Sequence, residues 1–400
     1  MIRHLFKLIW NRKRSNFLLI SEIFFCFLVL FAVLSLAFYN VRNYSKPIGF
    51  EHKNVWLLSL RPNSDSTAQN LLIQEQLIRR VRAFPEVEKA SYSSTNTPFS
   101  FNSSNLHLSY NKLKTASANI YEVQDDFPEV MQLKMQQGRW FGNQDNASRN
   151  TPIVINAKLK QQLFGEEEAI GKELSLDDKM RSPDDTMRYV VVGVVEYFRA
   201  GSEYEGDEAS FFSRIDLQKS QNQRWGSLLL RVKPGIGIAF EEKMVKELSG
   251  IAKDWTIEAT TLEKMRQNKA KVTLVPVIAL GLICAFLILN VALGLFGVLW
   301  YNINRRTGEI GLRRALGAAS GQIYRQFIGE VVVLASFGLL FGVLFAVQFP
   351  LLQVFQVESE VYFSALVCAV LIIYLVTTFC AIYPSRQAAR IQPAVALHEE

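Results

Sequence analysis

Apolar residues collect in four long runs, and the rest of the chain is largely polar. The runs extend over residues 17–39, 272–300, 327–349 and 362–384. An α-helix rises about 1.5 Å per residue, so about 20 residues cross the roughly 30 Å hydrocarbon core of a bilayer. Each run reaches that length. The pattern therefore predicts four transmembrane helices, with one long polar insert at residues 40–271 between the first and the second.

The polar insert shows strand and helix periodicities in irregular alternation. β-branched and aromatic runs of strand length predict strands at Val55–Leu60, Tyr189–Phe198, Gly226–Val232 and Thr256–Thr261. Apolar positions at helical spacing predict helices at Thr67–Phe84, Asn156–Phe164 and Ile238–Leu248. This mixture is typical of an α+β domain.

Two polar stretches of the insert predict how that domain is divided and connected. We expect two lobes, joined at Asn143–Asn150 and again near Ser202–Asp207. At the end of the insert, Leu262–Lys271 contains no helix breaker and leads directly into the second apolar run. The second transmembrane helix is therefore predicted to extend beyond the bilayer as a stalk.

The start of the chain, residues 1–16, alternates apolar side chains with basic ones. This pattern predicts an amphipathic helix on the inner leaflet, and contact with a partner protein is the alternative. The apolar run that follows is about 20 residues long, whereas a cleaved signal peptide has about 7 to 15. We therefore expect the first run to be an uncleaved membrane anchor.

The placement of charge predicts the orientation of the four helices. The insert at 40–271 is nearly balanced, with 32 Lys and Arg against 30 Asp and Glu. The short loop at 350–361 has no basic residue and carries Glu358 and Glu360. Basic residues instead flank the other short segments: Arg3, Lys7, Arg12, Lys13 and Arg14; Arg305, Arg306, Arg313, Arg314 and Arg325; Arg386 and Arg390. The positive-inside rule then places both termini and 301–326 in the cytoplasm, and the insert outside.

Composition supports a membrane protein and offers little for an enzyme. Hydrophobic residues make up 49% of the chain, and the net charge of +7 is explained by topology without a nucleic-acid-binding patch. All four cysteines (Cys26, Cys284, Cys368 and Cys380) lie in apolar runs, and the four histidines are scattered singly. We therefore expect no disulfide framework, no metal site and no bound cofactor.

Three sets of residues resemble functional sites but have simpler explanations. Gly165–Lys172 has five residues between its glycines, where a phosphate-binding loop has four, and Glu173 replaces the Ser or Thr that would bind magnesium. The carboxylates Glu22 and Glu330 are shallow in their runs and can reach an interface or a neighbouring helix. An exposed turn explains the remaining acidic cluster better than a cation site: Asp177, Asp178, Asp184 and Asp185.

The segment between the second and third apolar runs, Arg305–Glu330, is unusually ordered for a loop. Thr307 is expected to cap a short helix, and Glu309 lies in its first turn. Helical spacing places Ile310, Leu312, Ala315 and Leu316 on an apolar side, while Arg313 and Arg314 point elsewhere. The stretch 317–321 then ends this helix before a second one enters the third run. Two interpretations stay open: packing on the lipid interface, or docking into a groove of a cytoplasmic protein.

These residues resemble the MacB/FtsX-type permeases of ABC transporters. Arg306–Ala318 (RTGEIGLRRALGA) is similar to the family's loop after the second span, except that Gly308 replaces a basic residue. Tyr383–Glu400 is similar to its closing segment. In the insert, Gly138–Phe141 with Asp145, Pro152–Gly171 and Val190–Phe198 are similar to its extracytoplasmic domain. The first span departs from the pattern because it lacks the usual glycines and carries Glu22.

The resemblance implies a non-catalytic permease subunit in a bacterial inner membrane, with a periplasmic MacB-like domain and a cytoplasmic tail at 385–400. Its partners would be a separate cytoplasmic ABC ATPase, a second permease copy or paralogue, a periplasmic adaptor with an outer-membrane duct, and membrane lipid, but no nucleic acid. The implied ATPase-coupling residues are Glu309, Ile310, Gly311, Leu312, Arg313, Arg314, Ala315, Leu316, Gly317 and Ala318. The alternatives are a membrane-anchored sensor or scaffold without transport, and an ion-coupled carrier.

Overall fold

The computed structural model describes residues 13–63, 67–93, 96–111, 114–176, 188–215, 226–352 and 354–392. The chain forms two compact units, Met1–Arg42 with Leu274–Glu400 (the membrane unit) and Asn43–Thr273 (the outer unit). Several sequence predictions lie outside the described residues: residues 1–12 of the amphipathic helix, the acidic cluster Asp177, Asp178, Asp184 and Asp185, and the chain end from residue 393.

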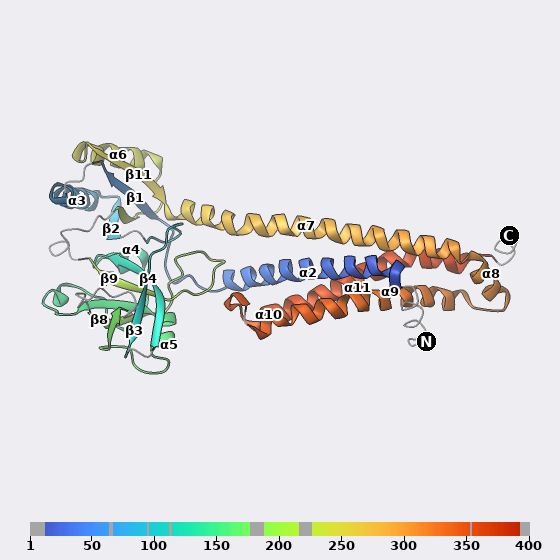
Figure 1. The fold of residues 1–400 in the computed structure, drawn as a ribbon. Helices are drawn as coiled ribbons and strands as arrows, with labels where there is room; N and C mark the ends of the chain where they lie inside the picture. Colours follow the sequence, from blue (N-terminus) through green and yellow to red (C-terminus); the bar gives the residue numbers. More distant parts are fainter. Residues whose placement is uncertain are drawn as a thin grey trace. The chain divides into compact units, whose positions relative to one another are not determined.

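Among the described residues, four helices are long and apolar enough to cross a membrane, as the sequence predicts (Figure 1). They are α2 (Lys13–Tyr44), α7 (Leu262–Arg305), α9 (Ser320–Ala346) and α11 (Ser359–Arg390). Shorter elements connect them: α8 (Thr307–Ala315), α10 (Gln348–Leu351) and η2 (Val354–Gln356). The predicted stalk at 262–271 is confirmed as helical, because α7 is one helix from Leu262 onward.

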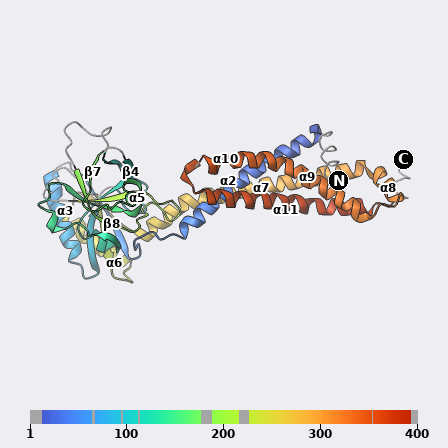
Figure 2. The ribbon, with the colours of Figure 1, turned by 90° about the horizontal axis from the view of Figure 1, so that it is seen from below.

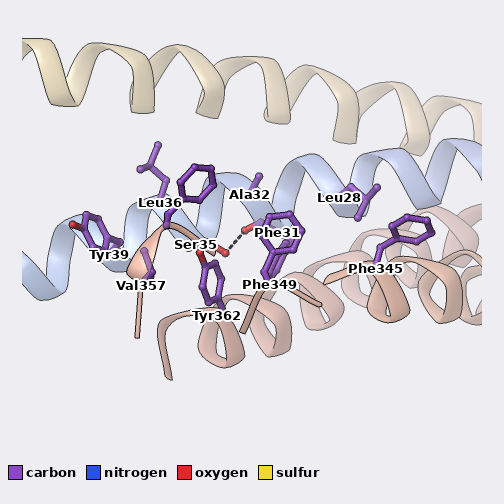
Figure 3. A pocket seen from close by; sticks show the side chains of 11 residues that line it. Leu28, Phe31, Ala32, Ser35, Leu36, Tyr39, Phe345, Phe349, Val357 and Tyr362 are labelled. Carbon is purple, nitrogen blue, oxygen red and sulfur yellow. Dashed lines mark hydrogen bonds between the residues drawn. The ribbon is translucent and has the colours of Figure 1, made fainter. Parts of the chain in front are cut away.

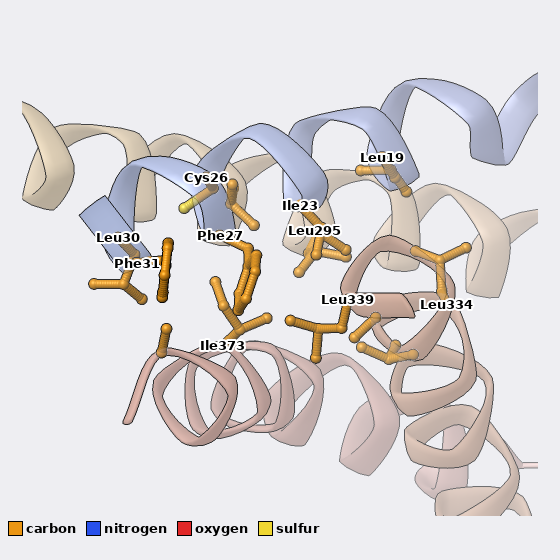
Figure 4. Close-up of a cluster of buried hydrophobic side chains, with 14 of the residues drawn as sticks. Leu19, Ile23, Cys26, Phe27, Leu30, Phe31, Leu295, Leu334, Leu339 and Ile373 are labelled. Atoms are coloured by element: carbon orange, nitrogen blue, oxygen red, sulfur yellow. The ribbon is translucent and has the colours of Figure 1, made fainter. Parts of the chain in front are cut away.

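Small residues let the membrane helices approach one another closely. Gly338 and Gly342 lie one turn apart on α9, facing α2. A Cβ atom on Gly338 would lie 3.0 Å from the Ile20 carbonyl oxygen, and one on Gly342 would lie 2.4 Å from the Phe27 ring. In lipid, the hydrophobic effect does not drive helices together. Small residues instead allow close van der Waals packing between them. Figure 4 shows Phe27 among the buried side chains where α2, α9 and α11 meet.

Helices α9 and α11 run side by side in both views of the chain (Figures 1 and 2). One side of α11 carries buried small residues at multiples of four positions: Ala365, Ala369, Thr377 and Ala381. Figure 2 also shows α10 beside the end of α9, where the chain turns back.

The outer unit contains eleven described strands in one hydrogen-bonded network. The strands are β1 (Val55–Pro62), β2 (Val87–Ser93), β3 (Asn105–Tyr110), β4 (Lys114–Val123), β5 (Met135–Gly138), β6 (Thr151–Asn156), β7 (Glu173–Leu176), β8 (Arg188–Val195), β9 (Ser210–Arg214), β10 (Ser227–Val232) and β11 (Trp255–Thr261). Its helical elements are α3 (Thr67–Arg82), α4 (Phe127–Met131), η1 (Asn143–Asp145), α5 (Ala157–Leu163) and α6 (Ile238–Ile251). The predicted strands and helices of the insert are confirmed, with ends that shift by a few residues.

One lobe, which we call lobe A, is a split β-α-β arrangement of the ferredoxin-like kind. Its chain order is β1-α3-β2 followed by β10-α6-β11, and its sheet order is β11-β1-β10-β2 with every neighbour antiparallel. Apolar side chains of α3 and α6, including Leu77, Val81 and Met244, are buried with Leu58 and Leu230 of the sheet. Figure 1 shows both helices beside these strands.

The other lobe, lobe B, is inserted between β2 and β10. Its strands pair in the order β4-β3-β7-β8-β6-β9, and β9 pairs again with β4, so the described strands close a ring. The β4–β9 and β6–β8 pairs are parallel and the others in the ring are antiparallel. The ring encloses its own apolar cluster, with Ile153, Ile155 and Phe211 fully buried.

The predicted lobe junctions at Asn143–Asn150 and Ser202–Asp207 are wrong. The chain passes between the lobes after β2 and before β10. The first predicted junction is a turn inside lobe B, where Asp145 accepts hydrogen bonds from Arg139 at 2.6 and 2.8 Å and from the Gly142 N–H at 2.9 Å. The second is fixed by buried Arg199, which donates to the carbonyl oxygens of Glu203 and Glu205. Polar composition there reflects hydrogen-bonded turns and not a linker.

Candidate functional site

The candidate site is helix α8, which follows α7 after a break at Arg306. Thr307 does not cap it as predicted, since the cap position belongs to Arg306. The Thr307 hydroxyl instead donates to the carbonyl oxygens of Ile303 and Asn304, at 3.3 and 2.8 Å. The end of α7 supplies these carbonyl groups one turn before Thr307, and a Thr hydroxyl readily bonds back to such groups.

Helix α8 ends at the glycine-containing stretch, as predicted, and the structure shows that it ends in a Schellman motif. Gly317 has φ +94°, and its N–H donates to the carbonyl oxygen of Arg314 at 3.1 Å. The N–H of Ala318 donates to the carbonyl oxygen of Arg313 at 3.0 Å. Glycine suits this left-handed position because it has no Cβ atom to clash there.

The predicted single apolar side of α8 is wrong, because its apolar residues lie on two sides. Ile310 is 4% exposed, whereas Leu312 is 52% and Leu316 is 80% exposed. Successive helical residues are about 100° apart, so Leu312 lies roughly 200° around the helix from Ile310. The outward side carries Glu309, Leu312, Arg313 and Leu316 at the i, i+3, i+4 and i+7 spacing of helices that insert into grooves. We call these four residues the outward face.

The inward side of α8 packs on the membrane helices. Ile310 belongs to a buried cluster with Ile303, Ile323, Phe327 and Ala388, which come from α7, α9 and α11. Gly311 is also buried. The packing attaches the middle of α8 to the ends of three membrane helices.

Two arginines strengthen this attachment. Arg314 Nη1 donates to the carbonyl oxygens of Ala389 and Ile391, at 2.8 and 2.9 Å, and so binds the end of α11. Arg313 Nη1 donates to Gln326 Oε1 of α9 at 3.0 Å, and Arg313 also pairs with Glu309. Arg314 therefore points toward the end of α11, and backbone carbonyl acceptors of this kind leave no pattern in the sequence.

An ion pair links the start of α8 to α9. Arg306 Nη1 lies 3.3 Å from Glu330 Oε1, and Gln326 Nε2 donates to the same oxygen at 3.2 Å. The prediction that Glu330 reaches a neighbouring group is confirmed. Gln326 was missed, because a polar residue 13 positions from Arg313 in sequence has no recognisable spacing.

The loop Gly165–Lys172 is a turn before strand β7, as expected for a false phosphate loop. Lys172 Nζ lies 2.5 Å from Glu167 Oε1, and the Tyr110 hydroxyl donates to the same oxygen at 3.1 Å. The hydrogen bond from Lys172 is the main cause that lowers the pKa of Glu167. The lysine that would bind a phosphate is therefore paired with an acid of its own loop.

The first turns of α7 belong to the outer unit and are held within it by ion pairs. Arg266 Nε lies 2.5 Å from Glu203 Oε1, and Arg266 also donates to Glu263 at 3.1 Å. Lys269 Nζ donates to the Ser100 carbonyl oxygen at 3.3 Å. Glu263 also lies 3.0 Å from His52 Nε2, and burial followed by the charge of Arg266 lowers the pKa of that histidine.

The chain matches two family models that together cover most of its length. Residues 20–246 match the MacB-like periplasmic core domain, and residues 281–393 match the FtsX-like permease C-terminal domain. The chain belongs to the MacB/FtsX-type family of ABC transporter permeases. All ten implied coupling residues of this permease, from Glu309 to Ala318, lie inside the FtsX-like match. The four apolar helices and the MacB-like domain indicate an inner-membrane protein.

Relatives of this permease include exporters with an ATP-binding part. The macrolide export ATP-binding/permease protein MacB of Pasteurella multocida is 27% identical over 296 residues, which are 72% of this chain and 44% of that protein. The pyoverdine export ATP-binding/permease protein PvdT of Pseudomonas aeruginosa is 26% identical over 282 residues, 68% of this chain and 41% of that one. The permease thus spans less than half the length of these relatives.

A solved structure, the periplasmic region of MacB from Actinobacillus actinomycetemcomitans, is 18% identical in sequence to this permease. The structural match covers 57% of this chain and 95% of the chain in that structure, with a TM-score of 0.39.

Proposed function

We propose that this chain is the non-catalytic permease subunit of an ABC transporter, and that the outward face of α8 docks into a cleft of a separate cytoplasmic ATPase. The observation that carries the proposal is the pair of leucines on that face. Leu312 and Leu316 are exposed on a helix that is otherwise firmly attached to the membrane unit. Burial of one such side chain contributes roughly 1.5 to 3 kcal/mol, so the two leucines together would contribute about 3 to 6 kcal/mol to docking.

ATP hydrolysis is assigned to a partner polypeptide. The curated relatives are named as ATP-binding/permease proteins, and this chain matches less than half of each. Gly165–Lys172 lacks the spacing of a phosphate loop, and Lys172 is paired with Glu167. The partner would supply the ATP-binding part that the relatives carry in one polypeptide.

In this proposal, ATP-driven movement of the partner reaches the outer unit through α8 and α7. Ile310 and Arg314 fix α8 to the ends of the membrane helices, and Arg266 and Lys269 fix the start of α7 within the outer unit. Both termini would lie in the cytoplasm and the outer unit in the periplasm. Two permease copies or paralogues would act together, with a periplasmic adaptor and an outer-membrane duct, in export or in lipoprotein or signal handling.

The test is capture of the partner ATPase by the tagged permease in detergent, together with the ATPase rate of the reconstituted complex. We expect Leu312→Asp with Leu316→Asp to abolish both, because buried carboxylates add a desolvation cost to the lost contacts. The matched control is Leu72→Asp, which alters an equally exposed leucine, at 64%, on α3 of the outer unit. Undiminished capture by the double variant would overturn the docking role and favour a membrane-anchored sensor or scaffold.

A further inference from the structure

An apolar cavity of about 510 Å³ lies inside the membrane unit, between α2 and the segment that joins α9 to α11. One stripe of α2 forms a wall of it, with Leu28, Phe31, Ala32, Ser35, Leu36 and Tyr39. The facing wall comes from Phe345 of α9, Phe349 of α10 and Tyr362 of α11, with Phe355 and Val357 between them. Figure 3 shows these side chains around the space.

The described lining of the cavity is mostly hydrocarbon, and its two buried polar side chains, Ser35 and Tyr362, are already hydrogen-bonded. The Ser35 hydroxyl donates to the Phe31 carbonyl oxygen at 2.7 Å, and the Tyr362 hydroxyl donates to the Val354 carbonyl oxygen at 2.7 Å. Phe31, Phe349 and Tyr362 pack on one another with ring centroids 5.8 to 6.2 Å apart. Such a lining suits a ligand that brings no polar group into the cavity.

Charged side chains follow directly beyond one end of the cavity. Arg42 lies three residues after Tyr39 on α2, hence on the same side of the helix. It donates to Glu360 Oε2 at 2.9 Å and also pairs with Glu358, the residue next to Val357. The Arg42 and Glu360 side chains are 36% and 81% exposed, so a lipid headgroup can reach both the guanidinium and the carboxylate.

The size of the cavity favours a lipid chain over a protein partner. A helix with side chains is about 10 Å across and rises 1.5 Å per residue, so about 510 Å³ would hold roughly one turn of it. The cavity is open on one side, so a neighbouring helix could occupy it with about one turn at most. A single flexible hydrocarbon chain fits the space, and such chains surround the apolar helices in a bilayer.

We propose that this cavity binds one acyl chain of a zwitterionic phospholipid, with the headgroup at Arg42, Glu358 and Glu360. The phosphate complements Arg42, and an amine headgroup such as ethanolamine complements the two glutamates. The assignment to the outer leaflet rests on the proposed orientation of the permease. The cavity itself is independent of any ATPase partner, so this proposal and the proposed function can fail separately.

The experiment uses the full chain in nanodiscs of phosphatidylcholine that contain phosphatidylethanolamine with a photoreactive group in one acyl chain. After illumination, labelled peptides are identified by mass spectrometry. We expect labelling concentrated in residues 28–39 and 354–362, and at least fivefold lower labelling there in Ala32→Trp, which fills the cavity. Ala279→Trp is the matched control, since Ala279 is exposed on α7 and does not line the cavity. Ala32→Phe repeats the test with a smaller side chain if the tryptophan variant melts early.

Each remaining outcome decides a part of the proposal. Even labelling of all lipid-facing surfaces, or unchanged labelling in both Ala32 variants, would overturn the site. A disulfide between two chains of an Ala32→Cys variant would show a protein contact and overturn the lipid assignment. Labelling of the cavity by a photoreactive lipophilic export substrate, without labelling by the phospholipid, would overturn it as well. Unlabelled phosphatidylethanolamine should compete about threefold better than phosphatidylglycerol, and equal competition would overturn the headgroup assignment.

Discussion

Arg306 and Glu330 form an ion pair, with an Nη1 to Oε1 distance of 3.3 Å. Arg306 lies at the junction of α7 and α8, and Glu330 lies on α9. Their side chains are 13% and 19% exposed. A pair so far removed from water fixes the start of α8 by charge as well as by packing. Its loss therefore affects the part of the permease that we assign to ATPase docking.

We expect Arg306→Met alone to destabilise the permease, because it leaves the Glu330 carboxylate without its cation. Removal of one partner from a fully buried ion pair lowers the free energy of unfolding by about 3 to 5 kcal/mol. Because this pair is partly exposed, we expect a loss of about 2 to 3 kcal/mol. The double variant Arg306→Met with Glu330→Met should recover part of the loss. Melting temperature in detergent is the measurement, and Arg313→Ala, an exposed change worth at most about 1 kcal/mol, is the control. A double variant less stable than the single one would contradict the prediction.

The orientation is tested by cysteine labelling from outside intact cells. A cysteine in place of exposed Ser249 on α6 should react with an impermeant thiol reagent, and one in place of exposed Ala319 after α8 should not. The prediction follows from the basic residues beside the spans. The native cysteines lie in the membrane helices, where such a reagent does not reach. Outside labelling at Ala319 would reverse the orientation and remove the basis for ATPase docking.

Gly317→Ala should weaken coupling through the end of α8. At φ +94° a side chain costs about 1 to 2 kcal/mol, and relief of that strain would unwind the last turn, which carries Leu316. We expect lower ATPase capture with unchanged membrane insertion. Gly308→Ala is the matched control, because a Cβ there meets nothing within 4 Å, and alanine favours a helix interior over glycine by about 1 kcal/mol. Equal capture by the two variants would show that the cap has no part in docking.

Gly342→Ala should lower the melting temperature of the permease in detergent. The added Cβ would lie 2.4 Å from the Phe27 ring, so α2 and α9 must separate or Phe27 must change its rotamer. Overpacking of this kind costs typically about 1 to 3 kcal/mol. Gly297→Ala on α7 makes the same change where nothing lies within 4 Å, and its melting temperature should match the parent. If both variants melt alike, α2 and α9 do not depend on this contact.

The outer unit, Asn43–Thr273, is expected to fold when expressed alone and to hydrolyse no ATP. It should lose stability as the pH falls below about 4, the ordinary range of an aspartate. The hydrogen bonds from Arg139 lower the pKa of Asp145 in the folded state, so their contribution is present above that range and is lost as the carboxylate becomes protonated. Urea unfolding at pH 7 and pH 3 measures the loss, and Asp145→Asn should reduce the difference between the two. An unchanged difference would assign the acid sensitivity to other carboxylates.

Sequence reasoning succeeded where local composition decides the structure. Four apolar runs must become helices in lipid, because a bilayer leaves backbone groups no other partners, and the β-branched run at 189–198 favours a strand in any context. The lobe junctions depend on the pairing of β4 with β9, in which paired residues such as Asn119 and Ser210 lie 91 positions apart, and no local pattern reveals this pairing. The face of α8 that is buried depends equally on Phe327 and Ala388, so periodicity identified the helix but not its inward side.

The strand that follows α2 and the strand that precedes α7 are direct neighbours in lobe A. Trp56 pairs with Thr261, and the ladder continues to Pro62 opposite Trp255. Because the strands are antiparallel, the chain enters and leaves this ladder at the same end. Displacement of one strand along its length would shear all hydrogen bonds between β1 and β11 at once. Lateral separation of the two strands would break these hydrogen bonds one after another, starting at Trp56. Lobe A is therefore stiffer toward a displacement of β11 along its own length than toward a lateral separation of β11 from β1.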